Sequence, residues 1–405
     1  MRRVVITGIG IVSSIGDNAG EVLSSLREAR SGIVKAHDYE RLGFKCQVHG
    51  APSLDPDQVL ERRLRRFMGD GAAWNSIAMS EAIEDAGLEQ GDIKNERTGL
   101  IMGSGGPSTR TIVAAADKIR EKTPRRISSF AVPAAMSSTN SATLSVPFGI
   151  RGASYSISSA CSTSAHCIGN GAELIQWGKQ DIVFAGGGEE LDWTLSALFD
   201  AMRAMSTHFN DTPQAASRPY DVDRDGFVIA GGGGVVVLEE LQHARARGGK
   251  IYAELVGYGA TSDGFDMVQP SGEGAVRCMR QALAGTVERV DYINPHATAT
   301  PIGDPCEIKA IRQVFGDTIP PISATKALTG HSLGAAGVHE AIYSLLMMHH
   351  GFICKSANIE TLDPEFADMP IVRKRIDNAE LNLVLSNSFG FGGTNASLVF
   401  QRYID

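Results

Sequence analysis

The chain has 405 residues, 43% of them hydrophobic, and a formal net charge of −8. This length is enough for a large core, built as two packed layers or two fused units. The negative charge gives no indication of binding to nucleic acid or to an acidic membrane surface. No run of 18 apolar residues occurs, so no segment is expected to span a membrane. The six cysteines are scattered without a CxxC pair, which argues against a disulfide framework or a zinc ribbon and predicts a reducing compartment, the cytoplasm.

Strand-like and helical segments alternate along the chain. The strand-like runs cover 4–8, 100–103, 153–159, 182–186 and 227–238, and most of them end in Gly or Ser. Helical patterns cover 18–30, with Asp17 as the expected N-cap, and a stretch around Trp74 that Gly87 closes. A further helix is expected over 239–247. This alternation predicts an α/β layered fold with buried, largely parallel sheets.

The pattern restarts near residue 250. A Gly-x-Gly segment at Gly8 and Gly10 follows the first strand, and a similar one at Gly257 and Gly259 follows another strand-like run. This echo, together with the chain length, predicts two similar halves. We place the first half at 1–250 and the second at 251–405.

The stretch from Ser156 to Cys167 is the most informative one. An alternating segment runs into Cys161, and small, helix-compatible residues follow as far as about Gly178. We therefore expect Cys161 at the end of a strand and in the first turn of a helix. The helix dipole and free N–H groups there are expected to lower the pKa of the thiol and to supply oxyanion donors. The alternative is a small buried cysteine packed behind a strand.

Three later stretches combine polar side chains with strand ends or glycine-rich loops. The first is 291–307, the second 323–337 and the third 386–395; their candidate residues are His296, Thr298, Thr300, Glu307, Lys326, His331, Phe389 and Phe391. Taken separately, each stretch has a plain structural interpretation, such as a hydrogen-bonded histidine at a strand end or a turn with a packed ring.

Other patterns indicate chemistry only weakly. Gly330-His-Ser332-Leu-Gly334 matches a nucleophile elbow, which leaves a serine hydrolase acting through Ser332 as an alternative. The dinucleotide-binding pattern at Gly8 lacks its third glycine, and a calcium-like loop at 221–232 ends in Gly232 where a Glu is required. We therefore expect neither a cofactor nor a metal.

Together, the four stretches resemble the condensing-enzyme family, whose signature is a Cys-x-Thr-x-Ala nucleophile, His-x-Thr-x-Thr, Lys-x4-His and Asn-x-Phe-Gly-Phe-Gly-Gly in that order. The resemblance extends over essentially the whole chain. It implies a thiolase-like five-layer α/β/α/β/α sandwich of two similar halves, usually a homodimer. Within the family, 186–193 and 225–234 resemble β-ketoacyl-acyl carrier protein synthase I more than synthase II. A synthase II or a polyketide ketosynthase remains an alternative with the same chemistry.

The resemblance implies a decarboxylative Claisen condensation of an acyl thioester with malonyl-acyl carrier protein during fatty acid elongation. Cys161 would carry the acyl group, and the N–H groups of Cys161 and Phe391 would bind the oxyanion. His296 and His331 would stabilise the enolate, and Lys326 would hold them through Glu307. Phe391 would act as a gate. Thr298 and Thr300 would bind the pantetheine arm, and Phe389 would flank the tunnel mouth together with Phe391. Phe199 and Met202 would shape the acyl pocket.

Two departures from the family pattern concern the backbone near the nucleophile and His296. Ala297 and Ala299 stand where the family usually has Gly and Ser, and Ser162 replaces an alanine. If the family glycine needs a positive φ, Ala297 is strained by about 1 kcal/mol or more.

The expected partner is acyl carrier protein, an acidic protein, and it must bind a chain that is itself negative. Two basic clusters are candidates for this docking: Arg62, Arg63 and Arg66 match the family's docking positions, and Arg125 with Arg126 matches less securely. The alternative for such a run is a solvated charged face.

Overall fold

The computed structural model describes residues 1–404. Within them, one mixed sheet of nine strands runs through the molecule. Its spatial order is β5 (Ser154–Tyr155), β4 (Thr98–Gly103), β6 (Ile182–Glu189), β7 (Gly232–Glu240), β1 (Val4–Val12), β8 (Ala253–Ser262), β13 (Thr394–Gln401), β12 (Leu383–Gly390) and β9 (Tyr292–Asn294). The two central strands of this order, β1 and β8, pair over only two residue pairs. The sheet is therefore two smaller sheets joined at a narrow seam.

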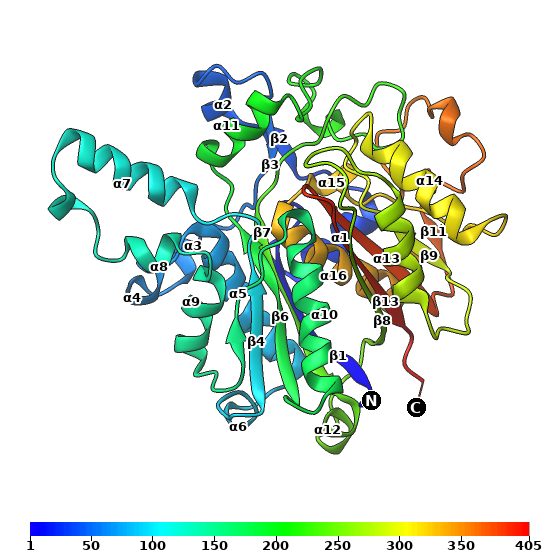
Figure 1. Cartoon of the computed structure of the whole chain (residues 1–405), viewed down its shortest axis with the longest axis horizontal. Coiled ribbons are helices and arrows are strands. Elements are labelled where there is room, and N and C mark those ends of the chain that lie inside the picture. The colour runs from blue at the N-terminus through cyan, green and yellow to red at the C-terminus, as the bar shows by residue number, and fades with distance from the viewer. Residues whose placement is uncertain (405) are drawn as a thin grey trace.

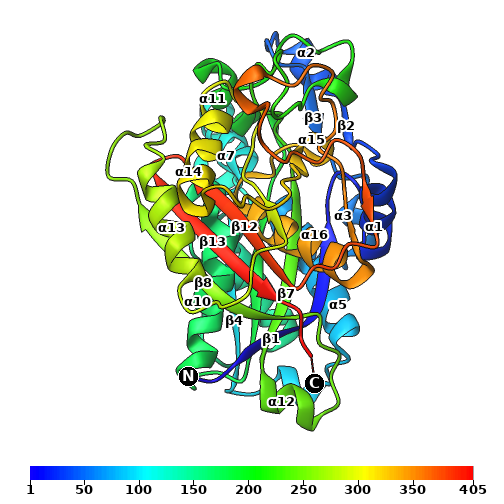
Figure 2. The same ribbon diagram turned by 90° about the vertical axis from the view of Figure 1, so that its right-hand side faces the viewer.

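Helices cover both faces and fill the space between the two half-sheets (Figures 1 and 2). Helix α5 (Asp70–Ala86) packs on β1 and β7, and α13 (Glu273–Leu283) packs on β8 and β13. Between the half-sheets, α10 (Thr163–Gln176) contacts α16 (Ala336–His350). The resulting layers are α/β/α/β/α, which confirms the expected sandwich.

The repeated Gly-x-Gly segments occupy equivalent positions in the two halves. A Cβ at Gly10 would lie 1.9 Å from the Ala78 carbonyl oxygen of α5, and one at Gly259 would lie 2.1 Å from the Cys278 carbonyl oxygen of α13. In each half, glycine lets a helix backbone lie directly against its strand. The repeated sequence pattern therefore marks the same close packing of a helix on a strand in each half.

The strand directions differ from the prediction of largely parallel sheets. Only β4–β5, β4–β6 and β9–β12 pair in parallel, whereas β1–β7, β6–β7, β8–β13 and β12–β13 are antiparallel. The hairpin β12–β13 needs only the three residues 391–393 as its turn, and both Gly392 and Gly393 there have positive φ. Such a turn reverses the chain without a crossover helix.

Several predicted boundaries shift. Helix α1 (Ala19–Glu28) is capped by Asn18, whose side chain accepts from the Glu21 N–H, and not by Asp17. Helix α5 ends at Gly87 with φ +62°, as predicted. The expected strand 153–159 shortens to β5, and the strand 227–238 begins only at Gly232 and extends to Glu240, before α12 (Leu241–Ala246).

The structure also contains further helices and two two-stranded sheets. They are α2 (His37–Arg41), α3 (Pro56–Val59), α4 (Arg62–Arg65), α6 (Gln90–Ile93), α7 (Thr109–Glu121), α8 (Ala131–Ala135), α9 (Thr139–Phe148), α11 (Trp193–Met202), α14 (Gly303–Phe315) and α15 (Lys326–Thr329), with the two-stranded pairs β2 (Ile33–Lys35) with β3 (Val48–Gly50) and β10 (Phe352–Ile353) with β11 (Ile376–Asp377). Figure 1 shows α7 projecting from the body of the molecule, so we call residues 109–130 the α7 arm. No residue of α7 is buried.

Candidate active site

Cys161 lies in a short 3₁₀ turn, η2 (Ala160–Ser162), directly before α10. Ala160 has φ +49°, in the left-handed region, so the chain turns sharply just before the cysteine. The Ser159 N–H donates to the Thr163 hydroxyl at 2.8 Å and no longer extends a strand ladder. This is why Cys161 follows an irregular segment and not the predicted strand, although it does immediately precede the helix.

The environment of the thiol opposes its ionisation. Burial raises the pKa of Cys161 to about 12, against the lowering effects of the Lys326 charge and of the Phe391 and Cys161 N–H groups. The backbone N–H groups lower this pKa, as expected, but desolvation outweighs them, so the net shift of the pKa is upward. The same two N–H groups point toward the sulfur, where an oxyanion hole requires donors.

Two imidazole rings complete the site around the sulfur. His331 Nε2 lies 2.9 Å from Cys161 Sγ, and the rings of His296 and His331 are nearly perpendicular with centroids 5.2 Å apart. One side-chain atom from each of these three residues lies within 4.8 Å of the other two. The structure thus brings together three residues that are up to 170 positions apart in the chain.

Each histidine is held by its backbone. The N–H of His331 donates to the Val228 carbonyl at 2.7 Å, and its own carbonyl accepts from the Ala230 N–H at 2.9 Å. His296 follows β9, and its N–H donates to Glu307 Oε1 at 2.9 Å. Burial, followed by the Lys326 charge, holds the pKa of both imidazoles well below the ordinary value. Both rings are therefore neutral at neutral pH and can present N–H donors.

Lys326 has a different partner from the one expected. Its Nζ donates to Glu340 Oε1 at 2.5 Å, and both side chains are buried. The Glu307 carboxylate instead accepts hydrogen bonds from the backbone N–H groups of His296 and Ala297. It also accepts one from the side chain of Asn387 at 3.2 Å. The prediction that Lys326 acts through Glu307 is corrected accordingly: Lys326 pairs with Glu340 on α16, and Glu307 positions the segment that carries His296.

A cavity of about 410 Å³ opens onto these groups. Of the candidate residues, its lining includes Cys161, His296, His331, Glu307, Thr298, Thr300, Phe389, Phe391, Phe199 and Met202. Phe391 is partly exposed, and its ring centroid lies 6.4 Å from that of Phe199. The nucleophile loop, the pantetheine candidates and the acyl-pocket candidates therefore share one continuous space.

Comparisons with known proteins agree with this geometry. Residues 1–244 match the beta-ketoacyl synthase N-terminal domain, and residues 252–360 match the beta-ketoacyl synthase C-terminal domain. The chain belongs to the β-ketoacyl synthase family.

Similar proteins are found at full length. The chain is 57% identical to 3-oxoacyl-[acyl-carrier-protein] synthase 1 of Haemophilus influenzae and 59% identical to that of Escherichia coli, with 100% of each chain covered. Identity to a synthase 2 of Rhizobium meliloti is 41%, covering 100% of this chain and 99% of that one. A crystal structure of a beta-ketoacyl synthase from Burkholderia phymatum superposes with a TM-score of 0.94 at 33% identity over 100% of both chains. The synthase I resemblance expected from the sequence is confirmed.

The hydrolase alternative is wrong. Ser332 Oγ lies 3.0 Å from His339 Nδ1, but both residues are buried. Among residues 1–404, neither belongs to the lining of the cavity. A hydrolytic serine must reach its substrate. This pair instead fixes the start of α16 beside the catalytic loop.

The two departures near His296 prove to be strained. Ala297 has φ +25° and Ala299 φ +68°, both in the region that favours glycine. The Ala297 N–H donates to Glu307, and the Ala299 N–H donates to Asp304 Oδ1 at 3.1 Å. The strained alternative considered for Ala297 therefore applies, and two buried carboxylates hold the strained backbone.

Sequence reasoning missed Glu340. The signal was present, because Glu340 is the single acidic residue in the largely apolar helix α16. A carboxylate that the helical pattern turns toward a core requires a cation or several donors. That requirement identifies Glu340 as a paired residue, although it does not identify Lys326 as the partner.

The five candidate docking arginines, Arg62, Arg63, Arg66, Arg125 and Arg126, are all exposed. The first three lie on or next to α4, and the other two form the 3₁₀ turn η1 (Pro124–Arg126) that follows α7. Arg66 lies over the Phe130 ring at 4.6 Å. The structure thus places one cluster beside the body and the other on the α7 arm.

Proposed function

We propose that this protein condenses an acyl thioester with malonyl-acyl carrier protein, releasing carbon dioxide and forming β-ketoacyl-acyl carrier protein in fatty acid elongation. The observation that carries this proposal is the meeting of Cys161, His296 and His331 within 4.8 Å on one cavity. Family membership and full-length similarity to synthase 1 proteins support it.

In the first half-reaction, Cys161 Sγ attacks the acyl thioester. Because the thiol is protonated at neutral pH, it must lose its proton as it attacks, and His331 Nε2 at 2.9 Å is in position to accept it. The proton then passes to the departing thiolate of the carrier. The N–H groups of Cys161 and Phe391 hold the tetrahedral oxyanion.

In the second half-reaction, malonyl thioester loses carbon dioxide and its carbonyl oxygen gains charge as an enolate forms. Neutral His296 donates an N–H to that oxygen, and His331 does so as the Nε2–H tautomer, which it reaches by exchange of its ring proton after the first half-reaction. The enolate carbon then attacks the acyl group on Cys161, the bond between the acyl carbon and Sγ breaks, and the Cys161 thiolate leaves and takes up a proton from solvent. Positively charged imidazoles would interact with the substrate before it reacts, whereas neutral N–H donors gain strength mainly as the oxygen becomes negative.

The cavity supports a division between the pantetheine arm and the acyl chain. Thr298 and Thr300 present hydroxyl groups 3.3 Å apart, which suits the amides of pantetheine. Phe199, Met202 and Phe389 line the apolar part. Phe391 precedes two glycines with positive φ, which allow its backbone to rotate as a gate.

We propose acyl carrier protein as the partner and the exposed arginines of α4 and η1 as its docking surface. One solved structure similar to this chain, at a TM-score of 0.91 and 28% identity, is a type II polyketide ketosynthase in complex with its acyl carrier protein. Complementary charge accelerates such encounters, and an overall negative enzyme needs a local basic patch to attract an acidic carrier.

A homodimer is supported by exposed apolar side chains along one side of the molecule. They lie on α7, α8, α9, β5 and α11, namely Ile112, Ile119, Val132, Val146, Tyr155 and Leu198. The edge strand β5 is exposed as well. A second copy would cover both the apolar faces and the strand edge.

We further propose that the division between the two halves lies near residue 250, between α12 and β8. The first half then carries Cys161, and the second carries His296, Lys326 and His331.

No helix within residues 1–404 is long and apolar enough to cross a membrane. The six free cysteines support a reducing compartment, the cytoplasm.

One experiment tests the proposed reaction. Purified protein is given malonyl-acyl carrier protein and a graded series of acyl-carrier substrates, and product chain lengths are measured by mass spectrometry. We expect β-ketoacyl products lengthened by one malonyl-derived unit, and none from Cys161→Ala. Hydrolysis of the acyl thioester without condensation in the wild type would contradict the proposal.

A further inference from the structure

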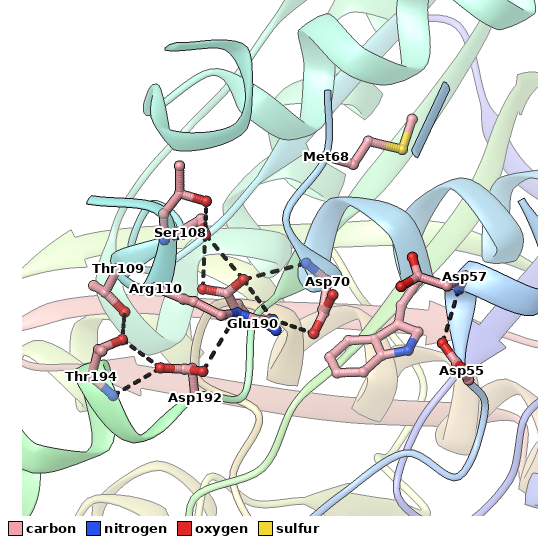
Figure 3. A network of polar contacts seen from close by, with 12 residues as sticks. Asp55, Asp57, Met68, Asp70, Ser108, Thr109, Arg110, Glu190, Asp192 and Thr194 are labelled. Atoms are coloured by element: carbon pink, nitrogen blue, oxygen red, sulfur yellow. Dashed lines mark hydrogen bonds and ion pairs between the residues drawn. The ribbon is translucent and has the colours of Figure 1, made fainter. Parts of the chain in front are cut away.

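A charged network joins the base of the α7 arm to Asp70 at the start of α5 (Figure 3), and Asp70 extends it to Arg65 of the α4 turn. Glu190, just beyond β6, is buried and accepts hydrogen bonds from the Ser108 hydroxyl at 2.9 and 3.0 Å. Ser108 is the N-cap of α7. Arg110 in the first turn of α7 donates to Glu190 Oε1 at 3.1 Å. The start of the arm is thus fixed by polar contacts, since the helix itself buries no residue.

Arg110 also binds the first residue of α5, Asp70. A third carboxylate, Asp192, lies 3.5 Å from Arg110 Nε. Burial disfavours the charged guanidinium, but Asp70 and the two other carboxylates outweigh it and raise the pKa of Arg110. Asp70 is therefore one of three carboxylates that fix the arm, and its side chain is only 18% exposed.

The same Asp70 binds Arg65 on α4. Arg65 additionally donates to the Met68 carbonyl at 2.5 Å and pairs with Asp57 at 2.6 Å, with only 19% of its side chain exposed. Its neighbours Arg62, Arg63 and Arg66 are exposed. Helix α4 has no buried residue and no side-chain cap. The contacts of Arg65 therefore anchor a turn that has little else to hold it.

We propose that Asp70 is a positioning residue for carrier docking: by binding Arg65 and Arg110 together, it sets the orientation of the α4 turn relative to the α7 arm. This inference rests on the docking surface proposed above, because the two exposed basic clusters lie on those two elements. A carrier that contacts both clusters binds well only if their spacing is fixed before binding. Asp70 itself does not line the cavity described above.

The direction in which carrier affinity changes distinguishes a positioning role of Asp70 from a purely electrostatic one. Asp70→Asn removes a negative charge close to the basic surface. If Asp70 acted only through its charge, an acidic carrier would bind more tightly to the variant. If Asp70 positions the two elements, the carrier binds less tightly despite the more favourable net charge.

The test compares KM and kcat on carrier-bound and on coenzyme A-bound substrates. We expect Asp70→Asn to raise KM for malonyl-acyl carrier protein about five-fold or more while kcat on malonyl-coenzyme A stays within about two-fold of wild type. Hydrogen exchange of residues 109–121 should accelerate in the same variant. Asp57→Asn is the matched control, because it removes an equal charge from Arg65 without touching the arm, and its KM should be unchanged or lower.

A second variant, which preserves charge, tests the same inference in case Asp70→Asn does not fold. Arg65→Lys keeps the charge, but a single ammonium cannot reproduce the separate guanidinium bonds to Asp70 and the Met68 carbonyl. We expect it too to raise KM for the carrier substrate selectively. This variant decides the question if Asp70→Asn does not fold.

The outcomes distinguish this inference from the docking proposal through a third variant, Arg62→Glu with Arg66→Glu. If that variant raises KM for the carrier while Asp70→Asn and Arg65→Lys do not, docking stands and the positioning role is overturned. If none of the three raises it, the docking surface is wrong and the inference falls with it. Equal losses on carrier-bound and coenzyme A substrates in Asp70→Asn would also overturn the inference, since they indicate a role in the fold alone.

Discussion

Removing the cation from the buried pair of Lys326 and Glu340 should destabilise the protein in a pH-dependent way. In Lys326→Met, the Glu340 carboxylate loses its partner where only 2% of its side chain is exposed. Breaking a buried ion pair on one side typically costs about 3–5 kcal/mol, because the remaining charge is uncompensated. Glu340 can avoid part of this cost by binding a proton, and this makes the cost depend on pH.

The pH window follows from the pKa of Glu340. Burial raises it to about 7, and Lys326 is the main effect that opposes this rise. An acid whose pKa is higher in the folded state binds more protons when folded, so its contribution to stability falls as pH rises from the unfolded to the folded pKa. In the wild type this decline ends near pH 7. In Lys326→Met the pKa is higher still, so the decline continues by up to about 1.4 kcal/mol between pH 7 and 8.

Urea unfolding at pH 6, 7 and 8 measures this difference directly. The expected result is a free energy of unfolding that falls more steeply between pH 7 and 8 in Lys326→Met than in the wild type. The double variant Lys326→Met with Glu340→Gln, which has no charge to compensate, should regain most of the stability and lose the extra slope. Parallel pH profiles for the single variant and the wild type would refute the argument, as would a double variant no more stable than the single one.

Further predictions concern the nucleophile, the histidines and the docking surface. Cys161→Ala should abolish condensation, whereas Cys161→Gln should keep or raise uncoupled malonyl decarboxylation, because the amide resembles the acylated state; more than about one per cent residual condensation in the alanine variant would contradict the nucleophile assignment. His296→Ala and His331→Ala should each slow decarboxylation about 10²-fold or more, measured as carbon dioxide release, and a variant with normal release would show that its histidine is structural. Arg62→Glu with Arg66→Glu should raise KM for acyl-carrier substrates and leave kcat on short coenzyme A thioesters nearly unchanged, and added salt should weaken carrier binding more in the wild type than in this variant.

The order of elements could be predicted from the sequence because it depends on local pattern. Helix α5 ends at Gly87 as expected, and the Gly-x-Gly echo marks equivalent close contacts in the two halves. Strand direction could not be predicted in the same way. The sequence indicates the glycine-rich segment around Phe391 as a candidate functional loop, but its role as the turn of an antiparallel hairpin depends on which strands become neighbours. That choice is made by tertiary packing and not by the turn residues alone.

The candidate site could be assembled from motifs because each motif fixes one short piece of backbone. The motifs do not determine which side chains of these pieces contact one another. Lys326 and Glu340 are 14 positions apart, and the sequence offered Glu307 as an equally reasonable partner. Likewise, the local pattern around Cys161 indicates a helix terminus that favours a thiolate, whereas the surrounding protein removes water from the sulfur and raises its pKa. Burial is a property of the whole fold, so a local motif cannot predict it.

The positive φ angles near the sulfur and His296 explain why the catalytic loops need carboxylates behind them. Ala160, Ala297 and Ala299 all occupy backbone conformations that cost an alanine roughly 1 kcal/mol or more each. Such conformations persist only where the surroundings fix them. Glu307 and Asp304 supply this fixation by accepting the N–H groups of Ala297 and Ala299. A glycine at position 297, as in the family pattern, would need less support, so in this chain Glu307 contributes more to keeping His296 directed at Cys161.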